Sequence, residues 1–293
     1  LQEKTQNATH QANWKNSVFD TYDKASLNSD WMEELAQTAH DNKIDFLTSP
    51  YSIELIDKVY KFCNSLKIGS GDLTYHEIIK HAASKNKPLL IGTGASTLDE
   101  VKQLMELDEL KNNDIVLMQC NTSYKGDLKE DKFQNINVLK TYKKLFPGIT
   151  LGLSCHSPSN IPVIAAVTLG AKIIEKHFTD DRDREGPDHK FALDPEKWIK
   201  MINEVRSLER VLGDGVKRLE TNELETVVVQ RRSLFWSKDL KTGEEITRKC
   251  IKVLRPCPEN ALQANELDKL IGKIIKKDVK NGDMIKKEEI DFY

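Results

Sequence analysis

Residues 150–177 read TLGLSCHSPSNIPVIAAVTLGAKIIEKH, and this stretch decides the fold. Two short apolar runs, 150–154 and 172–177, enclose a longer segment with helical spacing, 161–169. That order is typical of a β-strand, a helix and a second β-strand parallel to the first. Because the same alternation begins at Ile44 and continues to this point, the sequence predicts a parallel α/β sheet.

Six apolar runs predict strands, at Ile44–Thr48, Leu66–Ser70, Leu89–Thr93, Ile115–Cys120, Thr150–Ser154 and Lys172–His177. The predicted helices are Ser52–Asn64, Tyr75–Lys85, Leu98–Leu107, Asn135–Leu145, Ile161–Leu169 and, longest of all, Asp194–Leu212. A closed (β/α)8 barrel needs about eight such units. The chain is therefore expected to be either an open doubly wound sheet or a TIM barrel that lacks its first two units. The absent initiator methionine and the Gln- and Asn-rich start favour the barrel.

The pattern changes after Gly213, where a polar stretch precedes short runs of alternating polarity. We predict a barrel domain over 1–213, a linker over 214–227 and a small β-rich domain over 228–293. Within this last domain the segment Lys238–Ile246 recurs as Lys277–Ile285. Each copy predicts a strand, a glycine-containing turn and a return strand, so we expect a compact pseudo-symmetric β-domain.

Composition narrows the class of partner. The 293 residues hold 44 Lys and Arg against 46 Asp and Glu, and no basic block is interleaved with aromatics, which argues against nucleic acid. No run approaches the roughly 20 apolar residues that cross a bilayer, and the polar start has no signal-peptide core, so neither a membrane partner nor export is expected. The five cysteines include no C-x-x-C pair, which indicates reduced thiols and a cytoplasmic protein.

Polar residues gather at the ends of the predicted strands, where parallel α/β barrels place their active sites. The run Lys67-Ile-Gly-Ser-Gly-Asp72 follows one strand, and Thr93 ends the next. Its glycines allow close approach of an anion, and Lys67, Ser70 and Thr93 offer donors that suit a phosphate. An ordinary tight turn between strand and helix explains the glycines equally well.

His156 and His177 close two consecutive strands whose ends are expected to lie about 5 Å apart. Two imidazoles at that spacing can share one divalent ion, with water or substrate oxygens completing its coordination. Strand alternation sends Lys176 to the face opposite His177. This argues against a Schiff base on Lys176 and leaves Lys67 as the candidate amine nucleophile.

In this order the motifs resemble those of the sialic acid synthase family, which includes N-acetylneuraminate, legionaminate and pseudaminate synthases. The resemblance covers nearly the whole chain and rests on Lys67–Asp72, Gly92–Gly94, Cys120–Tyr124, Ser154–His156, Ile174–Phe178, Gly186–His189 and Leu254–Pro256. It implies a (β/α)8 barrel followed by an SAF, or antifreeze-like, domain. It also implies a domain-swapped homodimer in which the small domain caps the partner's active site.

The resemblance further implies a reaction. Phosphoenolpyruvate (PEP) would condense with an open-chain N-acetylated amino sugar, either N-acetylmannosamine or a 6-deoxy diacetamido sugar. The products would be a nine-carbon 2-keto sugar acid and phosphate, and a divalent metal, usually Mn²⁺, would be the cofactor. By position, the implied roles are metal binding and catalysis for His156 and His177, PEP binding for Lys67, Ser70 and Tyr124, and sugar binding for Asp72, Asp188 and Arg255.

Several features depart from the family pattern. The first two strands, which supply a general base and a phosphate-binding lysine, have no counterpart, so this chain by itself is expected to be inactive. Cys155 stands where the family has aspartate, Gly92 where it has serine and Lys125 where it has proline. Two alternatives therefore stay open: a non-catalytic barrel that binds a sugar acid, and a Schiff-base pyruvate aldolase that uses Lys67.

Overall fold

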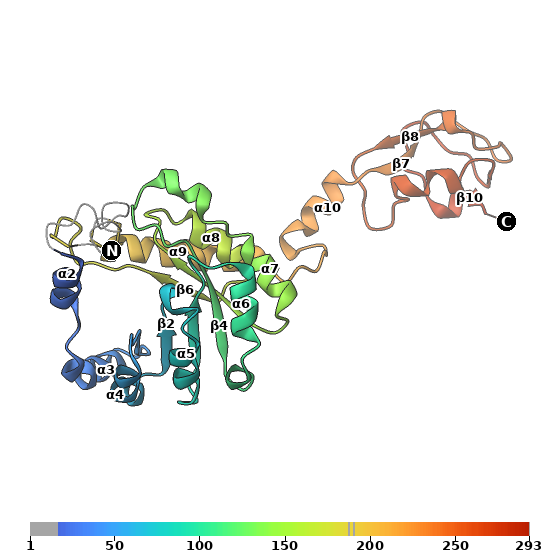
Figure 1. The fold of residues 1–293 in the computed structure, drawn as a ribbon. Coiled ribbons are helices and arrows are strands. Elements are labelled where there is room, and N and C mark those ends of the chain that lie inside the picture. Colours follow the sequence, from blue (N-terminus) through green and yellow to red (C-terminus); the bar gives the residue numbers. More distant parts are fainter. Residues whose placement is uncertain (1–16, 187, 190, 293) are drawn as a thin grey trace. The chain divides into compact units, whose positions relative to one another are not determined.

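The computed structural model describes residues 17–186, 188–189 and 191–292. Six parallel strands form one sheet in chain order (Figure 1), and the predicted class, an incomplete TIM barrel, is confirmed. The strands are β1 Leu47–Thr48, β2 Ser65–Ile68, β3 Leu89–Gly92, β4 Ile115–Cys120, β5 Thr150–Cys155 and β6 Ile173–Lys176. All six predicted runs contain a strand, although the first is reduced to two residues.

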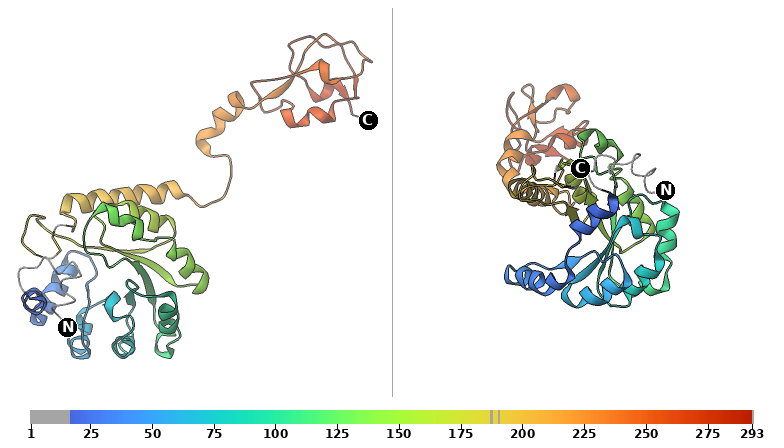
Figure 2. Two further views of the ribbon diagram at one scale, coloured as in Figure 1. Left: turned by 45° about the horizontal axis from the view of Figure 1, so that its top comes forward. Right: turned by 60° about the vertical axis from the view of Figure 1, so that its left-hand side comes forward.

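Helices cover the outer face of the curved sheet (Figure 2). They are α4 Ile53–Val59, α5 His76–Ala83, α6 Leu98–Met105, α7 Val138–Leu145, α8 Ile161–Thr168 and α9 Pro195–Leu212. Local chemistry fixes several ends: Thr97 and Glu100 form a capping box on α6, and Asp194 caps α9 ahead of Pro195. The helix predicted over Ser52–Asn64 stops early, because a 3-10 turn follows at Tyr60–Phe62.

Two helices were not predicted from the sequence, α2 Val18–Ala25 and α3 Met32–Asp41. Both lie before Ile44, where the predicted alternation of strands and helices begins. Residues 1–16 of the predicted barrel domain lie outside the described residues.

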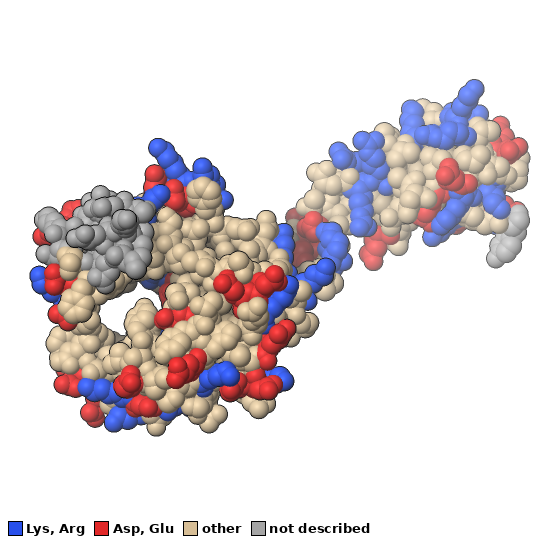
Figure 3. Space-filling model, viewed as in Figure 1, with Lys and Arg blue, Asp and Glu red and all other residues tan. Residues whose placement is uncertain are grey.

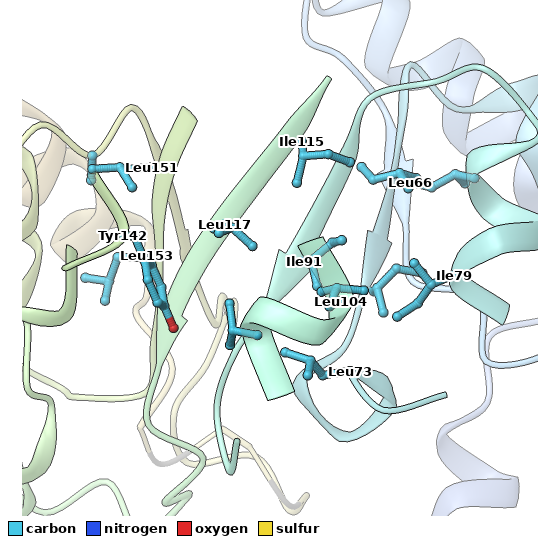
Figure 4. Close-up of a cluster of buried hydrophobic side chains, with 14 of the residues drawn as sticks. Leu66, Leu73, Ile79, Ile91, Leu104, Ile115, Leu117, Tyr142, Leu151 and Leu153 are labelled. Atoms are coloured by element: carbon cyan, nitrogen blue, oxygen red, sulfur yellow. The ribbon is translucent and has the colours of Figure 1, made fainter. Parts of the chain in front are cut away.

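Side chains alternate between the two faces of the sheet. The outward set packs beneath the helices in the main core (Figure 4) and includes Leu66, Ile91, Ile115, Leu117, Leu151 and Leu153. Burying one such side chain stabilises the fold by about 1.5–3 kcal/mol. The inward set includes Leu90, Val116 and Met118, which form a separate small cluster. Polar inward residues stand above this cluster, toward the carboxyl ends of the strands.

The chain divides after Gly213 into two compact units. The second contains the antiparallel pairs β7 Ser233–Trp236 with β8 Ile251–Leu254, and β9 Ile274–Ile275 with β10 Ile290–Asp291. Its core is built around the fully buried Trp236. The helix α10 Leu224–Gln230 was not predicted from the sequence. It crosses the predicted boundary between the linker and the small domain.

The two copies of the repeat are related by a pseudo-two-fold arrangement. Leu240 and Val279 exchange both backbone hydrogen bonds. Asp239 accepts from Lys280 Nζ at 2.8 Å, and its counterpart Asp278 accepts from Lys241 Nζ at 2.6 Å. The hairpin expected within each copy is therefore wrong, because the copies pair with each other. The expected pseudo-symmetry is confirmed.

Charges of both signs are interspersed over the face of the first unit seen in Figure 3. Among the helices that the structure describes, none has the length and apolar character needed to cross a membrane.

Candidate functional site

Four rings meet at the carboxyl ends of β4, β5 and β6. The His156 and His177 ring centroids lie 5.2 Å apart, and Tyr124 stands 4.2 Å from His156 and 6.0 Å from His177. Phe191 packs 4.9 Å from His177. The structure therefore brings the predicted histidine pair together with the predicted Tyr124. Burial raises the pKa of the Tyr124 hydroxyl, which stays protonated and able to donate.

The hydrogen bonding of His156 sets its tautomer. Nδ1 lies 2.8 Å from the carbonyl oxygen of Asn121, which can only accept, so Nδ1 carries the ring proton. The unprotonated Nε2 is then the available ligand atom. Burial lowers the pKa of His156 to about 4, and the ring is consequently neutral near pH 7. A neutral imidazole with its second nitrogen held by an oxygen is the form that binds metal ions.

His177 has a comparable arrangement. Its Nδ1 lies 3.3 Å from Oδ2 of Asp188, which leaves Nε2 as the nitrogen available to a ligand. Asp188, predicted to bind sugar, is thus placed beside the second histidine. The described residues contain no group of three or more His, Cys, Asp or Glu side chains placed to hold a metal ion. The two imidazoles fit a divalent ion whose remaining ligands are water or substrate oxygens.

Phe191 and Gly126 were not singled out from the sequence. A Cβ at Gly126 would stand 2.5 Å from Cβ of Phe191, and φ at this glycine is +63°. Only glycine therefore allows the loop after β4 to approach Phe191. The glycine was the available signal, but its distant partner could not be inferred from the sequence.

A second group of predicted residues lies in the interior of the curved sheet. The Ser70 hydroxyl accepts from the Gly94 amide at 3.0 Å and fills the space where Gly92 lacks a side chain, since a Cβ there would lie 2.6 Å from Ser70 Oγ. Lys67 is buried, and its Nζ lies 3.5 Å from the same position. Ser70 and Lys67 are thus brought together above Gly92.

Thr93 and Arg255 lie away from these two groups, whereas Asp72 belongs to the same short turn as Ser70. The Thr93 hydroxyl donates to the Met118 carbonyl at 2.9 Å and accepts from Tyr142 at 2.9 Å, so the structure turns it into the outer core and away from the cluster. Asp72 ends the short turn after Ser70, and burial raises the pKa of its carboxyl. Arg255 belongs to the second unit, where its Nε donates to the Gln230 carbonyl at 2.7 Å.

Cys155 and Lys176 face the outer layer, as strand alternation predicted for Lys176. The Lys176 ammonium donates to the carbonyls of Ser157 and Ser159 at 2.5 and 3.1 Å and lies 3.6 Å from Cys155 Sγ. The lysine therefore holds the loop that follows His156. Cys155 stands against it as a neutral thiol, because burial raises the pKa of Cys155.

These features define an incomplete α/β barrel with a histidine pair and one buried interior lysine near its strand ends, joined to a small β-rich domain. The NeuB family model matches residues 1–217 and the SAF domain model matches residues 231–291, so the chain belongs to the NeuB family. It is related to sialic-acid-type synthases that condense PEP, and such enzymes depend in general on a metal.

Two relatives from Campylobacter jejuni show the degree of similarity. The pseudaminic acid synthase is 32% identical over 274 residues, which span 93% of this chain and 78% of that protein. The N,N'-diacetyllegionaminic acid synthase is 31% identical over 258 residues, or 87% and 75% of the two chains. The crystal structure of a putative spore coat polysaccharide biosynthesis protein E from Chromobacterium violaceum, 20% identical, superposes with a TM-score of 0.78 over 95% of this chain and 82% of that one. This last likeness supports the fold.

Proposed function

We propose that the protein condenses PEP with an open-chain N-acetylated amino sugar to give a nine-carbon 2-keto sugar acid and phosphate. The observation that carries the proposal is the pair of adjacent histidines, His156 and His177, whose Nδ1 atoms each lie beside an oxygen, the Asn121 carbonyl and Asp188 Oδ2. A buried lysine and a serine in the adjoining interior supply the donors that an anionic substrate requires. Relatives named as pseudaminic and legionaminic acid synthases support the same chemistry.

In this proposal Lys67, Ser70 and Tyr124 bind PEP. Ser70 accepts from the Gly94 amide, and its own hydroxyl hydrogen can be donated to an incoming oxygen. C3 of PEP forms the new bond to the sugar aldehyde carbon, whose oxygen takes up a proton and becomes a hydroxyl. Water adds at C2 and gives up its protons, and the C2–O bond to phosphate breaks, so that the ketone and inorganic phosphate are released. Asp72 and Asp188 lie on the loops after β2 and β6, where they can accept hydrogen bonds from sugar hydroxyls.

His156 and His177 are the proposed ligands of a divalent ion, with Mn²⁺ as the candidate. When bound, such an ion supplies Lewis-acid activation of the sugar aldehyde. Asn121 and Asp188 fix the two rings so that both Nε2 atoms remain ligand atoms.

The small domain and Arg255 have a proposed role in a homodimer, where they cap the active site of the partner. Support comes from the match to the SAF domain model and from the exposed position of Arg255. We also propose a cytoplasmic location, because all five cysteines are free thiols.

The test separates binding from turnover. Calorimetry with Mn²⁺ is expected to show PEP binding. In a form that also carries the two missing strand–helix units, phosphate release is expected only when PEP, Mn²⁺ and N-acetylmannosamine or a 6-deoxy diacetamido sugar are all present. Phosphate release that continues after chelation would contradict the metal role. Binding of both substrates without any release in that extended form would favour the alternative of a non-catalytic sugar-binding barrel.

A further inference from the structure

Glu175 lies inside the curved sheet and has no role in the proposed reaction. It lies on β6, one residue before Lys176, and its side chain points inward because Lys176 packs on the outer side with Cys155. Its Oε1 accepts from the Ser154 hydroxyl at 2.7 Å, and its Oε2 lies 3.4 Å from Lys67 Nζ. One carboxylate thus joins two polar residues of the interior.

The contact with Lys67 crosses the interior of the curved sheet. Lys67 is on β2 and Glu175 on β6, and three strands separate them in the sheet. The two side chains therefore meet across the hollow side, above the cluster of Leu90, Val116 and Met118. This ion pair ties the strand that carries the proposed PEP lysine to the strand that precedes His177.

Lys67 needs such a tie. Its side chain is only 7% exposed, whereas that of Glu175 is 39% exposed. A lysine has four rotatable carbon–carbon bonds, and a buried ammonium is costly unless it is paired. Glu175 supplies the charge at a fixed place, because its second oxygen is anchored by Ser154.

We infer that Glu175 is a positioning residue, which holds Lys67 Nζ and the Ser154 hydroxyl in place for the phosphate-bearing substrate without touching that substrate itself. The inference rests on the proposed function in one respect, the identity of the substrate as PEP. The contact between Glu175 and Lys67 on which it depends can be tested without PEP.

The direction in which substrate affinity changes on removal of the Glu175 charge distinguishes a positioning role from a purely electrostatic one. Removing a carboxylate from a site that binds a polyanion should tighten binding if Glu175 acts only through its charge. If Glu175 positions Lys67, the same removal should weaken binding, since the lysine loses its fixed geometry. Glu175→Gln keeps an acceptor for Ser154 and removes the charge, so it separates the two cases.

Affinity for PEP in the presence of Mn²⁺ is the first measurement. We expect Glu175→Gln to bind PEP about tenfold more weakly, as for the loss of one charge-assisted hydrogen bond. Glu109→Gln is the matched control, because Glu109 pairs with Lys80 at 3.1 Å on the outer surface. The control should bind PEP like the wild type. Tighter or unchanged binding in Glu175→Gln overturns the inference.

Chemical reactivity of Lys67 is the second measurement and needs no substrate. Reductive methylation with formaldehyde, read at the Lys67 peptide by mass spectrometry, should be faster in Glu175→Gln than in the wild type and in Glu109→Gln. If the wild type binds no PEP, the proposed function fails while this rate still decides the inference. An unchanged rate at Lys67 refutes the positioning role.

Loss of folding is handled by a double variant. If Glu175→Gln unfolds because Lys67 is left buried without its partner, Lys67→Met combined with Glu175→Gln should regain stability in urea unfolding. A double variant that is no more stable than Glu175→Gln would show that the two residues are not coupled, and the inference would be wrong.

Discussion

Replacing Gly126 by alanine should destabilise the barrel and loosen the wall of the histidine site. The backbone at Gly126 has φ of +63°, which costs an L-residue about 1–2 kcal/mol. The added Cβ would also lie 2.5 Å from Cβ of Phe191, and relieving an overlap in a packed site costs about 1–3 kcal/mol. The free energy of unfolding should therefore fall by about 2–5 kcal/mol.

Gly148 provides the matched control. Its φ is +87°, but a Cβ there would meet nothing within 4 Å, so Gly148→Ala should lose only the backbone part, about 1–2 kcal/mol. Urea unfolding followed by circular dichroism measures both. In addition, Gly126→Ala should weaken Mn²⁺ binding, because Phe191 packs 4.9 Å from His177. Equal losses of stability and equal Mn²⁺ affinities in the two variants would refute the reasoning.

Three further predictions concern other parts of the molecule. Thr93→Val should cost about 1–3 kcal/mol of stability, because the Tyr142 hydroxyl loses its acceptor, yet leave PEP affinity unchanged; weaker PEP binding measured by calorimetry would restore Thr93 to the site. Lys176→Met should both destabilise the barrel and weaken Mn²⁺ binding, since the loop after His156 loses its donor; unaltered Mn²⁺ affinity would refute the second part. A hydrogen bond from Lys241 lowers the pKa of Asp278 to about 2, so the contribution of this pair is present above the unfolded-state value near 3.8 and is lost as the pH falls toward 2. Thermal unfolding of the second unit across that range should show a smaller acid loss in Asp278→Asn than in the wild type, and identical pH profiles would contradict this.

Periodicity along the chain was sufficient to predict the parallel α/β sheet and part of the site, but it left an open sheet and an incomplete barrel as alternatives. Alternating apolar runs located every strand of the sheet, and the same alternation separated Lys176 from His177 correctly. Alternation applied to β3 would also have turned Thr93 outward, to the face opposite Gly92. Thr93 was grouped with Lys67 and Ser70 because all three are hydrogen-bond donors near strand ends, although Thr93 faces the outer layer.

Contacts between distant segments could not be inferred in this way. Lys67 meets Glu175 because the sheet curves, and Gly126 meets Phe191 because two loops converge. Neither distance is encoded in a local pattern. The repeat in the second unit was visible from the sequence. The sequence did not show whether each copy forms a hairpin or pairs with the other copy, and the Leu240–Val279 bridge shows that the two copies pair with each other.

The most direct test of the proposed site is electron paramagnetic resonance of Mn²⁺ added to the protein. We expect one bound ion with hyperfine coupling to two histidine nitrogens, and loss of one coupling in each of His156→Gln and His177→Gln. Binding that persists unchanged in both variants, or an ion with no histidine coupling, would contradict the assignment of His156 and His177 as one metal site.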